Sequence, residues 1–494
     1  MKRLEEMCTA ALNASPEQDA LAFGEHWYSR GRMRALADRL AALLDAAGAP
    51  ADAPVAFAPR NHPASVAALI GLLAARRNVQ IVYVFQSPAG IARDLRRLAP
   101  AVAVVDRRDV GDALLQGMGE TGTAVFALGD MDVAPVAGLE HCRAPRGERD
   151  DEADERRIEI LTSGTTGPPK RFAMSYRAIA TYLAGGTAFG TGQDMSALPP
   201  GLLFFPLGNI SGLYSTLPTV LSGRRAVVLE RFSVEAWHAH VKRYRPEACG
   251  VPPAGVRMIL DADLPPEDLS SLRFLGTGAA PLDPEVQRAF EQRYGVPILL
   301  SYGATEFAGP VTAMTPQLHA EWGQHKFGSV GRAMPGARLR VVDPDSGAEL
   351  PAGEEGVLEV VSPRIGEHWI RTSDIAVLDA DGFLFHRGRA DGAITRGGFK
   401  LLPEVIERAL VRHPAVAAAG VVGVADRRLG EVPVAVIELR PGSTRPSVDE
   451  LEAHLREHVY ATHVPVDWRF VEALPRTPLL KVDQRALRAL FEQP

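Results

Sequence analysis

The sequence predicts an α/β protein with a large N-terminal domain of helix-covered, mostly parallel sheets, a β-rich subdomain inside it, and a small α+β C-terminal domain. Three observations support this prediction. Through the first half of the chain, apolar strand candidates alternate with helical periodicity, which is typical of a parallel sheet covered by helices. From Gly328 to Val361, short strands are separated by Gly and Pro turns. After Arg389 the composition changes, and about 100 residues in α+β order can form a separate small domain. We therefore expect domains at residues 1–390 and 391–494.

In the first half, helical periodicity covers residues 24 to 47, where leucines recur on one face. A buried helix is expected from Asn61 to Ala75, with Asn61 as its N-cap. Ser87 and Pro88 stand at the favoured cap and first-turn positions of another helix. The predicted strands are Val55–Ala58, Ile81–Phe85, Val102–Val105 and Ile158–Leu161.

The second half repeats the alternation less regularly. Its predicted strands are Arg224–Leu229, Leu272–Leu275, Val296–Leu300, Ala337–Val342 and Val357–Val361. The small domain is expected to contain helix Pro403–Val411, strands Val416–Val424 and Val432–Leu439, and helix Val448–His458.

The overall composition argues against several function classes. A chain of 494 residues is long enough for two or more domains with a large core. Its net charge of −6 argues against a general binder of nucleic acid or anionic membranes. The three cysteines, Cys8, Cys142 and Cys249, lie far apart, which fits a reducing compartment and shows no metal-ligand spacing. The N-terminus lacks an apolar signal core, and the longest apolar run near it, Val66–Ala75, is too short to span a bilayer. We expect a cytoplasmic enzyme without a membrane span.

The stretch from Thr162 to Lys170, Thr-Ser-Gly-Thr-Thr-Gly-Pro-Pro-Lys, concentrates hydrogen-bond donors behind a short apolar strand candidate. Its glycines let the backbone turn tightly and bring N–H groups close to a ligand. The hydroxyls, the N–H groups and the lysine charge together suit a phosphate. It is not a Walker loop, because Gly167 is followed by Pro168 where that motif requires lysine.

The segment Ser-Gly-Thr-Thr-Gly-x-Pro-Lys resembles the phosphate loop of the adenylate-forming superfamily, which includes acyl- and aryl-CoA ligases, firefly-type luciferases and nonribosomal-peptide adenylation domains. Further motifs extend the resemblance over nearly the whole chain. The resemblance implies ATP binding at Thr162, Ser163, Gly164, Thr165, Thr166, Gly167 and Lys170.

Two motifs behind predicted strands resemble the family's nucleotide site. The segment from Gly276 to Pro281 resembles the Gly-Gly-Ala-Pro loop that lies against adenine, which assigns Gly278, Ala279 and Ala280 to AMP. By itself it is a weak dinucleotide motif, because Pro281 replaces the third glycine. Ser-Tyr-Gly-Ala-Thr-Glu resembles the Tyr-Gly-x-Thr-Glu motif. It implies that Tyr302 stacks on adenine, Thr305 contacts the α-phosphate and Glu306 holds Mg²⁺.

Two later motifs resemble the ribose site and the interdomain hinge. Trp-Ile-Arg-Thr-Ser-Asp resembles Trp-x-x-Thr-Gly-Asp, which implies that Asp374 accepts hydrogen bonds from both ribose hydroxyls. Ser373 replaces the glycine of the family motif. Gly-Arg-Ala-Asp-Gly resembles the hinge motif of a mobile C-terminal domain. Arg389 then reaches the ribose or α-phosphate, Asp391 is the hinge residue, and Gly392 replaces an aspartate.

Two C-terminal motifs resemble the segments that exchange between half-reactions. Gly-Gly-Phe-Lys resembles the wall of the pantetheine tunnel and assigns Gly397, Gly398 and Lys400 to the thiol site. Pro-Arg-Thr-Pro-Leu-Leu-Lys resembles Pro-Arg-Thr-x-x-Gly-Lys. Lys481 is then the adenylation lysine that bridges carboxylate and phosphate, and Leu480 replaces the usual glycine.

The acyl pocket departs most from the family pattern. Asn209 stands where the family usually has histidine, and its amide can donate and accept but cannot titrate. The expected wall consists of Phe204, Asn209, Pro253, Gly278, Gly303 and Ala308. The other histidines, His325 and His386 among them, form no cluster in the sequence and are interpreted as structural or exposed.

The resemblance implies an AMP-forming ligase that uses ATP and Mg²⁺ to activate a small aryl or acyl carboxylic acid, with Lys481, Thr305 and Glu306 as its catalytic residues. We favour CoA as the acceptor. The alternatives are loading of a phosphopantetheine thiol on a carrier protein, and a nucleotide-binding protein without ligase activity. The oligomeric state, monomer or homodimer, stays open.

Overall fold

The computed structural model describes most of the chain. The described residues are 3–143, 155–162, 170–184, 195–396, 399–427, 429–477 and 480–492.

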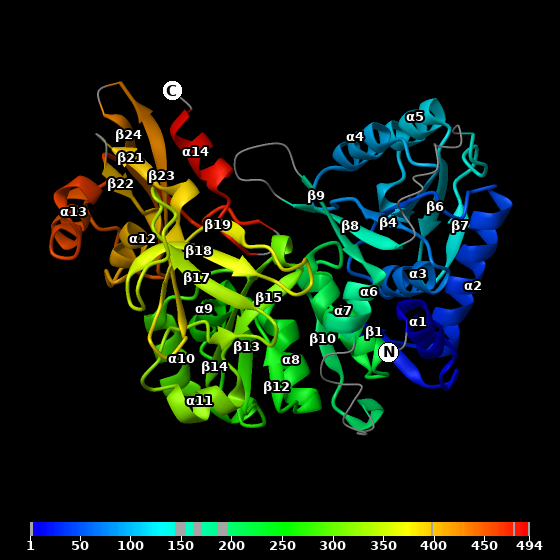
Figure 1. Ribbon diagram of the computed structural model, residues 1–494, viewed down its shortest axis with the longest axis horizontal. Coiled ribbons are helices and arrows are strands. Elements are labelled where there is room, and N and C mark those ends of the chain that lie inside the picture. The colour runs from blue at the N-terminus through cyan, green and yellow to red at the C-terminus, as the bar shows by residue number, and fades with distance from the viewer. Residues whose placement is uncertain are drawn as a thin grey trace. The chain divides into compact units, whose positions relative to one another are not determined.

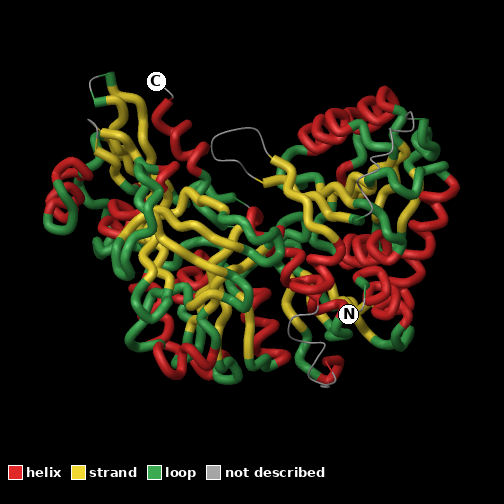
Figure 2. The backbone as a smooth tube through the Cα atoms, in the orientation of Figure 1, coloured by secondary structure: helices red, strands yellow, loops and turns green. Residues whose placement is uncertain are grey.

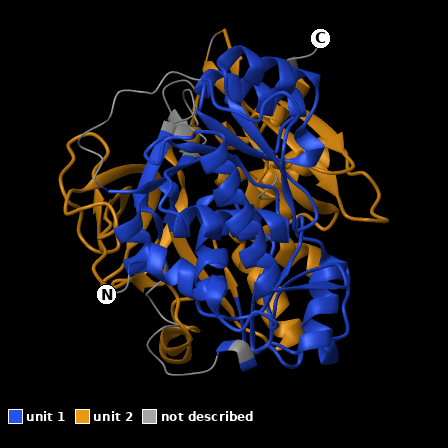
Figure 3. Cartoon of the chain, turned by 90° about the vertical axis from the view of Figure 1, so that its right-hand side faces the viewer, with its two compact units in different colours: residues 1–250, 261–275, 303–309 blue, residues 251–260, 276–302, 310–494 orange. Residues whose placement is uncertain are grey.

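The chain divides into two compact units, which Figure 3 shows in blue and orange. Unit 1 consists of residues 1–250, 261–275 and 303–309, and unit 2 of residues 251–260, 276–302 and 310–494. The predicted boundary between residues 390 and 391 stays a prediction.

A seven-stranded sheet is the centre of unit 1 (Figure 1). Its strands are β3 (Val55–Ala58), β4 (Val79–Ile81), β5 (Val102–Asp106), β6 (Ala124–Leu128), β7 (Val133–Pro135), β8 (Arg157–Thr162) and β9 (Lys170–Ser175). The order is β7-β6-β5-β3-β4-β8-β9, and all pairs are parallel except β6–β7 and β8–β9 at the two edges. The prediction of a mostly parallel sheet is confirmed.

Helices cover this sheet as the alternating pattern predicted. They are α1 (Leu4–Asn13), α2 (Arg30–Ala46), α3 (Pro63–Ala74), α4 (Pro88–Leu98) and α5 (Asp112–Thr121). Ile91 and Leu95 of α4 and Leu114 and Met118 of α5 pack in one cluster with alternate strand residues such as Ala56. Because successive strand residues face opposite sides, this cluster marks one face of the sheet.

A second sheet of unit 1 has the order β10-β11-β1-β2. Its strands are β1 (Asp19–Phe23), β2 (His26–Ser29), β10 (Gly201–Leu203) and β11 (Ala226–Val228). Unit 1 also contains the short helix α6 (Tyr176–Ala178), α7 (Ile210–Leu221), α8 (Val234–Tyr244) and strand β12 (Ala248–Gly250).

Three local predictions for unit 1 were wrong. Residues 26 to 29 form a strand, because Trp27 and Tyr28 pair with β1 and aromatic residues favour strands. Helix α3 is capped by the His62 imidazole, which accepts from the Ala64 N–H at 3.2 Å, and the Asn61 side chain points elsewhere. Strand β4 begins at Val79, two residues before the apolar run.

Unit 2 begins with mixed elements. They are helices α9 (Pro253–Asp261), α10 (Pro284–Tyr294) and α11 (Pro316–Trp322), and strands β13 (Phe274–Thr277), β14 (Ile298–Ala304), β15 (Gly309–Ala313) and β16 (Arg332–Ala333). Of these, α9, β13, β14 and β15 each have one or two residues that belong to unit 1. Four antiparallel strands follow as the predicted β-rich part, in the order β17-β18-β19-β20: β17 (Arg338–Val342), β18 (Glu355–Val361), β19 (Ile370–Leu378) and β20 (Leu384–Arg389).

The C-terminal part of unit 2 has the predicted α+β composition (Figure 2). Its elements are β21 (Ile394–Arg396), β22 (Phe399–Leu401), α12 (Pro403–Val411), β23 (Val416–Asp426), β24 (Gly430–Leu439), α13 (Val448–Arg456), β25 (Asp467–Val471) and α14 (Gln484–Glu492). Leu410 of α12 and Leu455 of α13 pack with Val421 on one face, and Leu487 of α14 packs with Val422 on the other. Among the described residues, no helix combines the length and apolar character needed to cross a membrane.

Candidate active site

The predicted phosphate loop joins two neighbouring strands of unit 1. Thr162 ends β8 and Lys170 begins β9, and the two residues face each other in the antiparallel register. The predicted ATP ligands between them, Ser163 to Gly167, lie outside the described residues.

Tyr302 and Asp374 of unit 2 meet as the nucleotide motifs predict. Tyr302 lies near the end of β14, and its hydroxyl donates to Oδ2 of Asp374 on β19. His386 of β20 places Nε2 3.3 Å from the other carboxylate oxygen, Oδ1. The Tyr302 and His386 rings lie 5.9 Å apart between centroids and are tilted by 32°. An aromatic ring, a carboxylate and an imidazole therefore form one polar cluster.

Burial and hydrogen bonding set the charges in this cluster. Burial opposes ionisation of the Asp374 carboxyl, but the hydrogen bonds from His386 and Tyr302 together hold its pKa below the ordinary value. Burial and the Asp374 charge raise the pKa of the Tyr302 phenol well above its ordinary value. At neutral pH the cluster therefore holds a carboxylate and a neutral phenol. A carboxylate has about four lone-pair sites, so two protein donors leave room for ribose hydroxyls.

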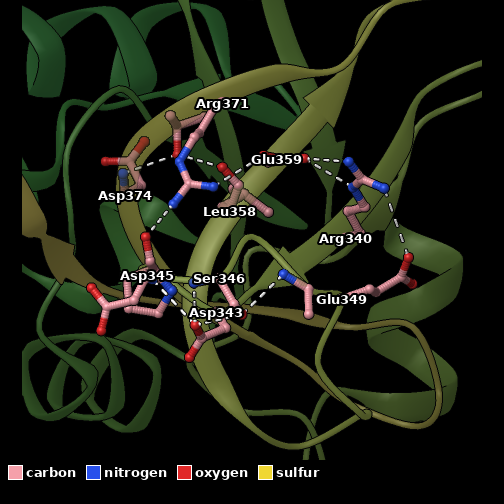
Figure 4. Close-up of polar contacts among 12 residues, drawn as sticks. Arg340, Asp343, Asp345, Ser346, Glu349, Leu358, Glu359, Arg371 and Asp374 are labelled. Carbon is pink, nitrogen blue, oxygen red and sulfur yellow. Dashed lines mark hydrogen bonds and ion pairs between the residues drawn. The ribbon is translucent and has the colours of Figure 1, made fainter.

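The strands around Asp374 hold it in place. The Asp374 N–H donates to Thr372 Oγ1 at 2.9 Å, and Thr372 Oγ1 donates to the Leu358 carbonyl at 2.8 Å. Figure 4 shows Asp374 near an ion-pair network in which Glu359 binds Arg340 at 2.7 Å and Arg371 at 3.4 Å. Because these contacts join β17, β18 and β19, the carboxylate rests on a rigid sheet.

His386 was interpreted from the sequence as structural or exposed; it is half-buried, and its imidazole lies at the Asp374 carboxylate, a contact that the sequence analysis did not predict. The alternation of β19 and β20 brings them together, since Ala376 pairs with His386 and Asp374 with Arg389. The signal lay in the register of two adjacent strands, which a search for sequence clusters does not detect.

Arg389 and Ser373 also meet in unit 2. Arg389 Nη2 donates to Ser373 Oγ at 2.7 Å. The serine in place of the family's glycine thus contacts the arginine predicted to reach the ribose or the α-phosphate. It offers Arg389 a hydrogen-bond acceptor that glycine lacks.

The predicted adenine loop packs beside Tyr302. A Cβ on Gly278 would lie 2.5 Å from Ser301 Oγ and 2.9 Å from the Ser301 carbonyl oxygen, so this position needs glycine. Ala279 adopts a left-handed φ of +68°. Since Ser301 directly precedes Tyr302, the loop and the aromatic ring lie at the same edge of unit 2, and Ala280 continues the loop.

Thr305 and Glu306 lie in a 3-10 turn of unit 1, Thr305–Phe307, which is fixed by the buried Phe307. The Glu306 side chain is exposed and makes no ion pair with any residue that the structure describes. Gly303 is the next-to-last residue of β14, before the turn, and Ala308 follows the turn with a left-handed φ of +55°. The carboxylate is therefore available to a ligand.

The remaining acyl-pocket candidates differ in their surroundings. Phe204 is buried and its ring centroid lies 4.5 Å from that of Phe205. Asn209 is the half-buried N-cap residue of α7, but its side chain makes no capping hydrogen bond. Pro253 begins α9 in unit 2 and is buried.

The hinge and thiol segments are described in part. Asp391 lies in the 3-10 turn Ala390–Gly392. Gly392 has no positive φ, and a Cβ there would meet nothing within 4 Å, so the backbone does not require glycine. Lys400 lies in β22, and Gly397 and Gly398 lie outside the described residues.

Glu407, which follows the thiol segment, faces the sheet of the small domain. Its Oε1 accepts from the Val421 N–H at 2.8 Å. Burial raises the pKa of Glu407 to about 8. This contact gives Glu407 a structural role between α12 and β23.

Lys481 lies in a tight loop. The Thr477 N–H donates to the Lys481 carbonyl at 2.7 Å, the Leu480 N–H donates to the Thr477 carbonyl at 2.8 Å, and Arg476 pairs with Val482 across the loop. The Lys481 side chain is exposed. Leu480 has a left-handed φ of +59°. The loop therefore adopts the backbone conformation that favours glycine although leucine occupies the position.

We expect Leu480→Gly to be more stable than Leu480→Ala by about 1 kcal/mol, because alanine keeps the Cβ that strains a left-handed residue and glycine removes it. The alanine variant is the matched control, since both substitutions delete the leucine side chain. Chemical denaturation of the full chain measures the difference. An alanine variant as stable as the glycine variant would contradict a strained Leu480.

The sequence matches two family models along its length. The model of the AMP-binding enzyme matches residues 8–367, and that of the AMP-binding enzyme C-terminal domain matches residues 405–481. The sulfoacetate–CoA ligase of Cupriavidus necator is 32% identical over 68% of this chain and 67% of that protein. The indoleacetate–CoA ligase of Aromatoleum aromaticum is 28% identical over 99% of this chain and 98% of that protein.

The fold is similar to that of solved enzymes. ATP-bound MatB from Rhodopseudomonas palustris superposes with a TM-score of 0.81 over 100% of this chain and 99% of that chain, at 22% identity. At this identity the superposition shows the fold alone, and it confirms the predicted α/β architecture. From the family models and the relatives, the chain belongs to the AMP-binding enzymes, the adenylate-forming superfamily.

Proposed function

We propose that the chain activates a small carboxylic acid with ATP, releasing pyrophosphate, and transfers the acyl group from the adenylate to the thiol of CoA, releasing AMP. The observation that carries this proposal is the cluster of Tyr302, Asp374 and His386 beside the loop at Gly278, which offers an aromatic face and an ionised acceptor to an adenosine. Relatives named as CoA ligases for sulfoacetate and indoleacetate support a small acid and CoA as the acceptor.

The proposed residue roles are those that the family motifs imply, and the chemistry of each group suits them. Asp374 accepts the ribose hydroxyls and Tyr302 stacks on adenine. Thr305 donates to the α-phosphate, and Lys481 places a positive charge between the carboxylate and the phosphate, which otherwise repel each other. The lysine and the loop donors hold the two reactants in line for attack of the carboxylate oxygen on the α-phosphorus.

Glu306 fits a role in holding Mg²⁺. Its carboxylate is exposed and without an ion pair among the described residues. Within the same residues no cluster of three or more His, Cys, Asp or Glu side chains is suited to a metal ion. A single carboxylate suffices, because Mg²⁺ usually takes its other ligands from phosphates and water. When bound, the ion would offset phosphate charge.

The second half-reaction belongs to the segment around Gly398 and Lys400, which would replace Lys481 at the site after rotation about Asp391. Glycines there would admit a thin pantetheine arm close to the backbone. A carrier-protein thiol would use the same arm, so the acceptor must be tested directly. A cytoplasmic location stays a prediction.

We expect acid-dependent ATP turnover to give AMP and pyrophosphate and no ADP. A panel of carboxylic acids is incubated with ATP and Mg²⁺, with and without CoA, and nucleotides and thioesters are separated by chromatography. Acid-dependent ADP would overturn the assignment. If the adenylate forms and no CoA thioester appears, but the acyl group is transferred to the phosphopantetheine thiol of a carrier protein, the acceptor is a carrier protein and not CoA.

A further inference from the structure

A cavity of about 260 Å³ lies inside unit 1, along strand β10 and beside helix α7. Residues from Pro200 to Phe205 line it, so it follows β10 from before its first residue to beyond its last. Strand β12 forms part of the wall with Cys249, whose thiol is kept protonated because burial raises its pKa to about 12. Figure 1 shows α7, β10 and β12.

One residue that lines the cavity, Tyr214, contacts the segment that follows the predicted catalytic turn. Tyr214 of α7 lines the cavity and lies directly against Gly309, where a Cβ would come within 2.0 Å of the tyrosine ring. Gly309 directly follows Ala308 and the turn that holds Thr305 and Glu306. Phe204 and Phe205 stand at the carboxyl end of the parallel strand β10, which is the end where α/β sheets bind ligands. Of the expected acyl-pocket wall, Phe204 lines the cavity, whereas its lining does not include Asn209, Pro253, Gly278, Gly303 and Ala308.

Arg224 is at the opposite end. It follows α7, and its Nε donates to the Pro199 carbonyl at 2.8 Å, just before β10 begins. Within the described part of the chain, no carboxylate pairs with Arg224. Burial lowers the pKa of Arg224, but a guanidinium stays protonated in proteins. The cavity therefore has at one end a partly buried positive charge that no described carboxylate neutralises.

His240 of α8 lines the same cavity and is only 4% exposed. It hydrogen-bonds to the backbone at Pro200, and its Nδ1 is buried without a partner among the described residues. Burial lowers the pKa of His240 to about 4, and the nearby charge of Arg224 acts in the same direction. A buried nitrogen without a hydrogen bond is costly unless a ligand or a water molecule satisfies it.

We propose that this cavity holds the body of the substrate acid and that Arg224 binds a second anionic group, a carboxylate or a sulfonate, at the far end of that body. The inference rests on the proposed function and names its substrate class. The walls between the two ends include Leu202, Leu203 and Pro218, so the two charged groups are separated by an apolar ring or chain. The Arg224 guanidinium donates to the distal anion, and His240 Nδ1 accepts from a water molecule that the anion holds.

The test compares acids that differ only at the distal group. Pyrophosphate release is measured with suberate against octanoate, and with terephthalate and para-sulfobenzoate against para-toluate. We expect kcat/KM for the preferred diacid to exceed that for its monoacid about tenfold or more. Arg224→Met keeps the length of the side chain and removes its charge. In this variant kcat/KM for the diacid should fall about 10- to 100-fold, while kcat/KM for the monoacid does not, since hydrogen bonds to charged groups are the strong ones. Whether terephthalate or para-sulfobenzoate is preferred distinguishes carboxylate from sulfonate.

Arg243→Met is the matched control, because Arg243 is an exposed arginine of α8 outside the cavity lining. It should keep the wild-type ratio. Arg224→Lys keeps a charge and should retain part of the preference if Arg224→Met fails to fold. Pyrophosphate release with monoacids but no diacid preference would overturn the inference and leave the proposed function standing. If no acid supports release, the proposed function fails, and the inference is then decided by thermal shift: a diacid that stabilises the wild type but not Arg224→Met supports it, and equal shifts overturn it.

Discussion

Lys481→Ala is expected to reduce adenylate formation by about 100-fold or more while leaving thioester formation from a supplied acyl-adenylate intact. The reason is that the lysine charge would be needed only while carboxylate and phosphate are brought together, and removing one preorganised donor of this kind costs about 100- to 1000-fold in rate. The loop should keep its shape, because it is closed by backbone bonds of Thr477, Leu480 and Lys481 that alanine retains. Pyrophosphate release and thioester formation measure the two half-reactions separately.

Two further variants make the Lys481 result specific. Lys400→Ala is expected to show the reverse behaviour, with adenylate formation retained and thioester formation impaired, because Lys400 belongs to the predicted thiol segment. Lys242→Ala removes an exposed lysine that pairs with Asp268 in unit 1 and should change neither step. If Lys481→Ala lowers the rates of both half-reactions equally, the assignment of Lys481 to adenylate formation and of Lys400 to thioester formation is wrong.

Patterns that extend over several residues predicted the structure well. Helix α12 covers the expected residues, Pro403–Val411, because Pro at its first turn and an apolar stripe define it locally. The strand before the phosphate loop is β8, close to the expected bounds. The succession of strands and helices was sufficient for the fold class because parallel strands require crossover helices.

The errors came from residues whose partners are distant in the sequence. Asn61 looked like a helix cap, but its amide donates to the carbonyls of Phe204 and Leu229 and its oxygen accepts from the Leu207 N–H. The local sequence does not distinguish an asparagine that caps a helix from a buried asparagine that hydrogen-bonds to the backbone of distant segments. Strand β4 was misplaced because Gln80 is polar, yet it is satisfied by Glu159 of the neighbouring strand at 3.0 Å.

Site residues that belong to a recognisable sequence motif could be predicted. Site residues that only the fold brings together could not. Tyr302 and Asp374 were identified by resemblance and do meet, although their roles toward a nucleotide stay proposals. His386 has no motif and is brought to Asp374 only by pairing of β19 with β20. Arg224 and His240 carry no motif either, since they come from a helix end and a separate helix that converge on one cavity.

Asp374→Asn is expected to raise the KM for ATP about tenfold or more. The amide keeps the shape of the side chain but loses the charge and part of the accepting capacity, and a hydrogen bond to a charged group contributes about 1.5–3 kcal/mol. The carboxylate is ionised in the wild type near neutral pH, because His386 and Tyr302 help to hold its pKa below the ordinary value. Asp381→Asn is the matched control: Asp381 is a more exposed carboxylate of the same unit that pairs with Lys326 and should not affect ATP.

A role in binding ribose can be separated from a role in holding Tyr302 and His386 by changing the nucleotide. If Asp374 binds the 2′-hydroxyl, then Asp374→Asn and the replacement of ATP by 2′-deoxy-ATP remove the same interaction. Their effects on kcat/KM should therefore not add. We therefore expect the wild type to prefer ATP over 2′-deoxy-ATP about tenfold, and Asp374→Asn to accept the two nearly equally. If Asp374 only supports the Tyr302 ring, the variant would weaken both nucleotides by the same factor and keep the wild-type preference. That outcome would leave Asp374 as a positioning residue and would require another acceptor for the ribose.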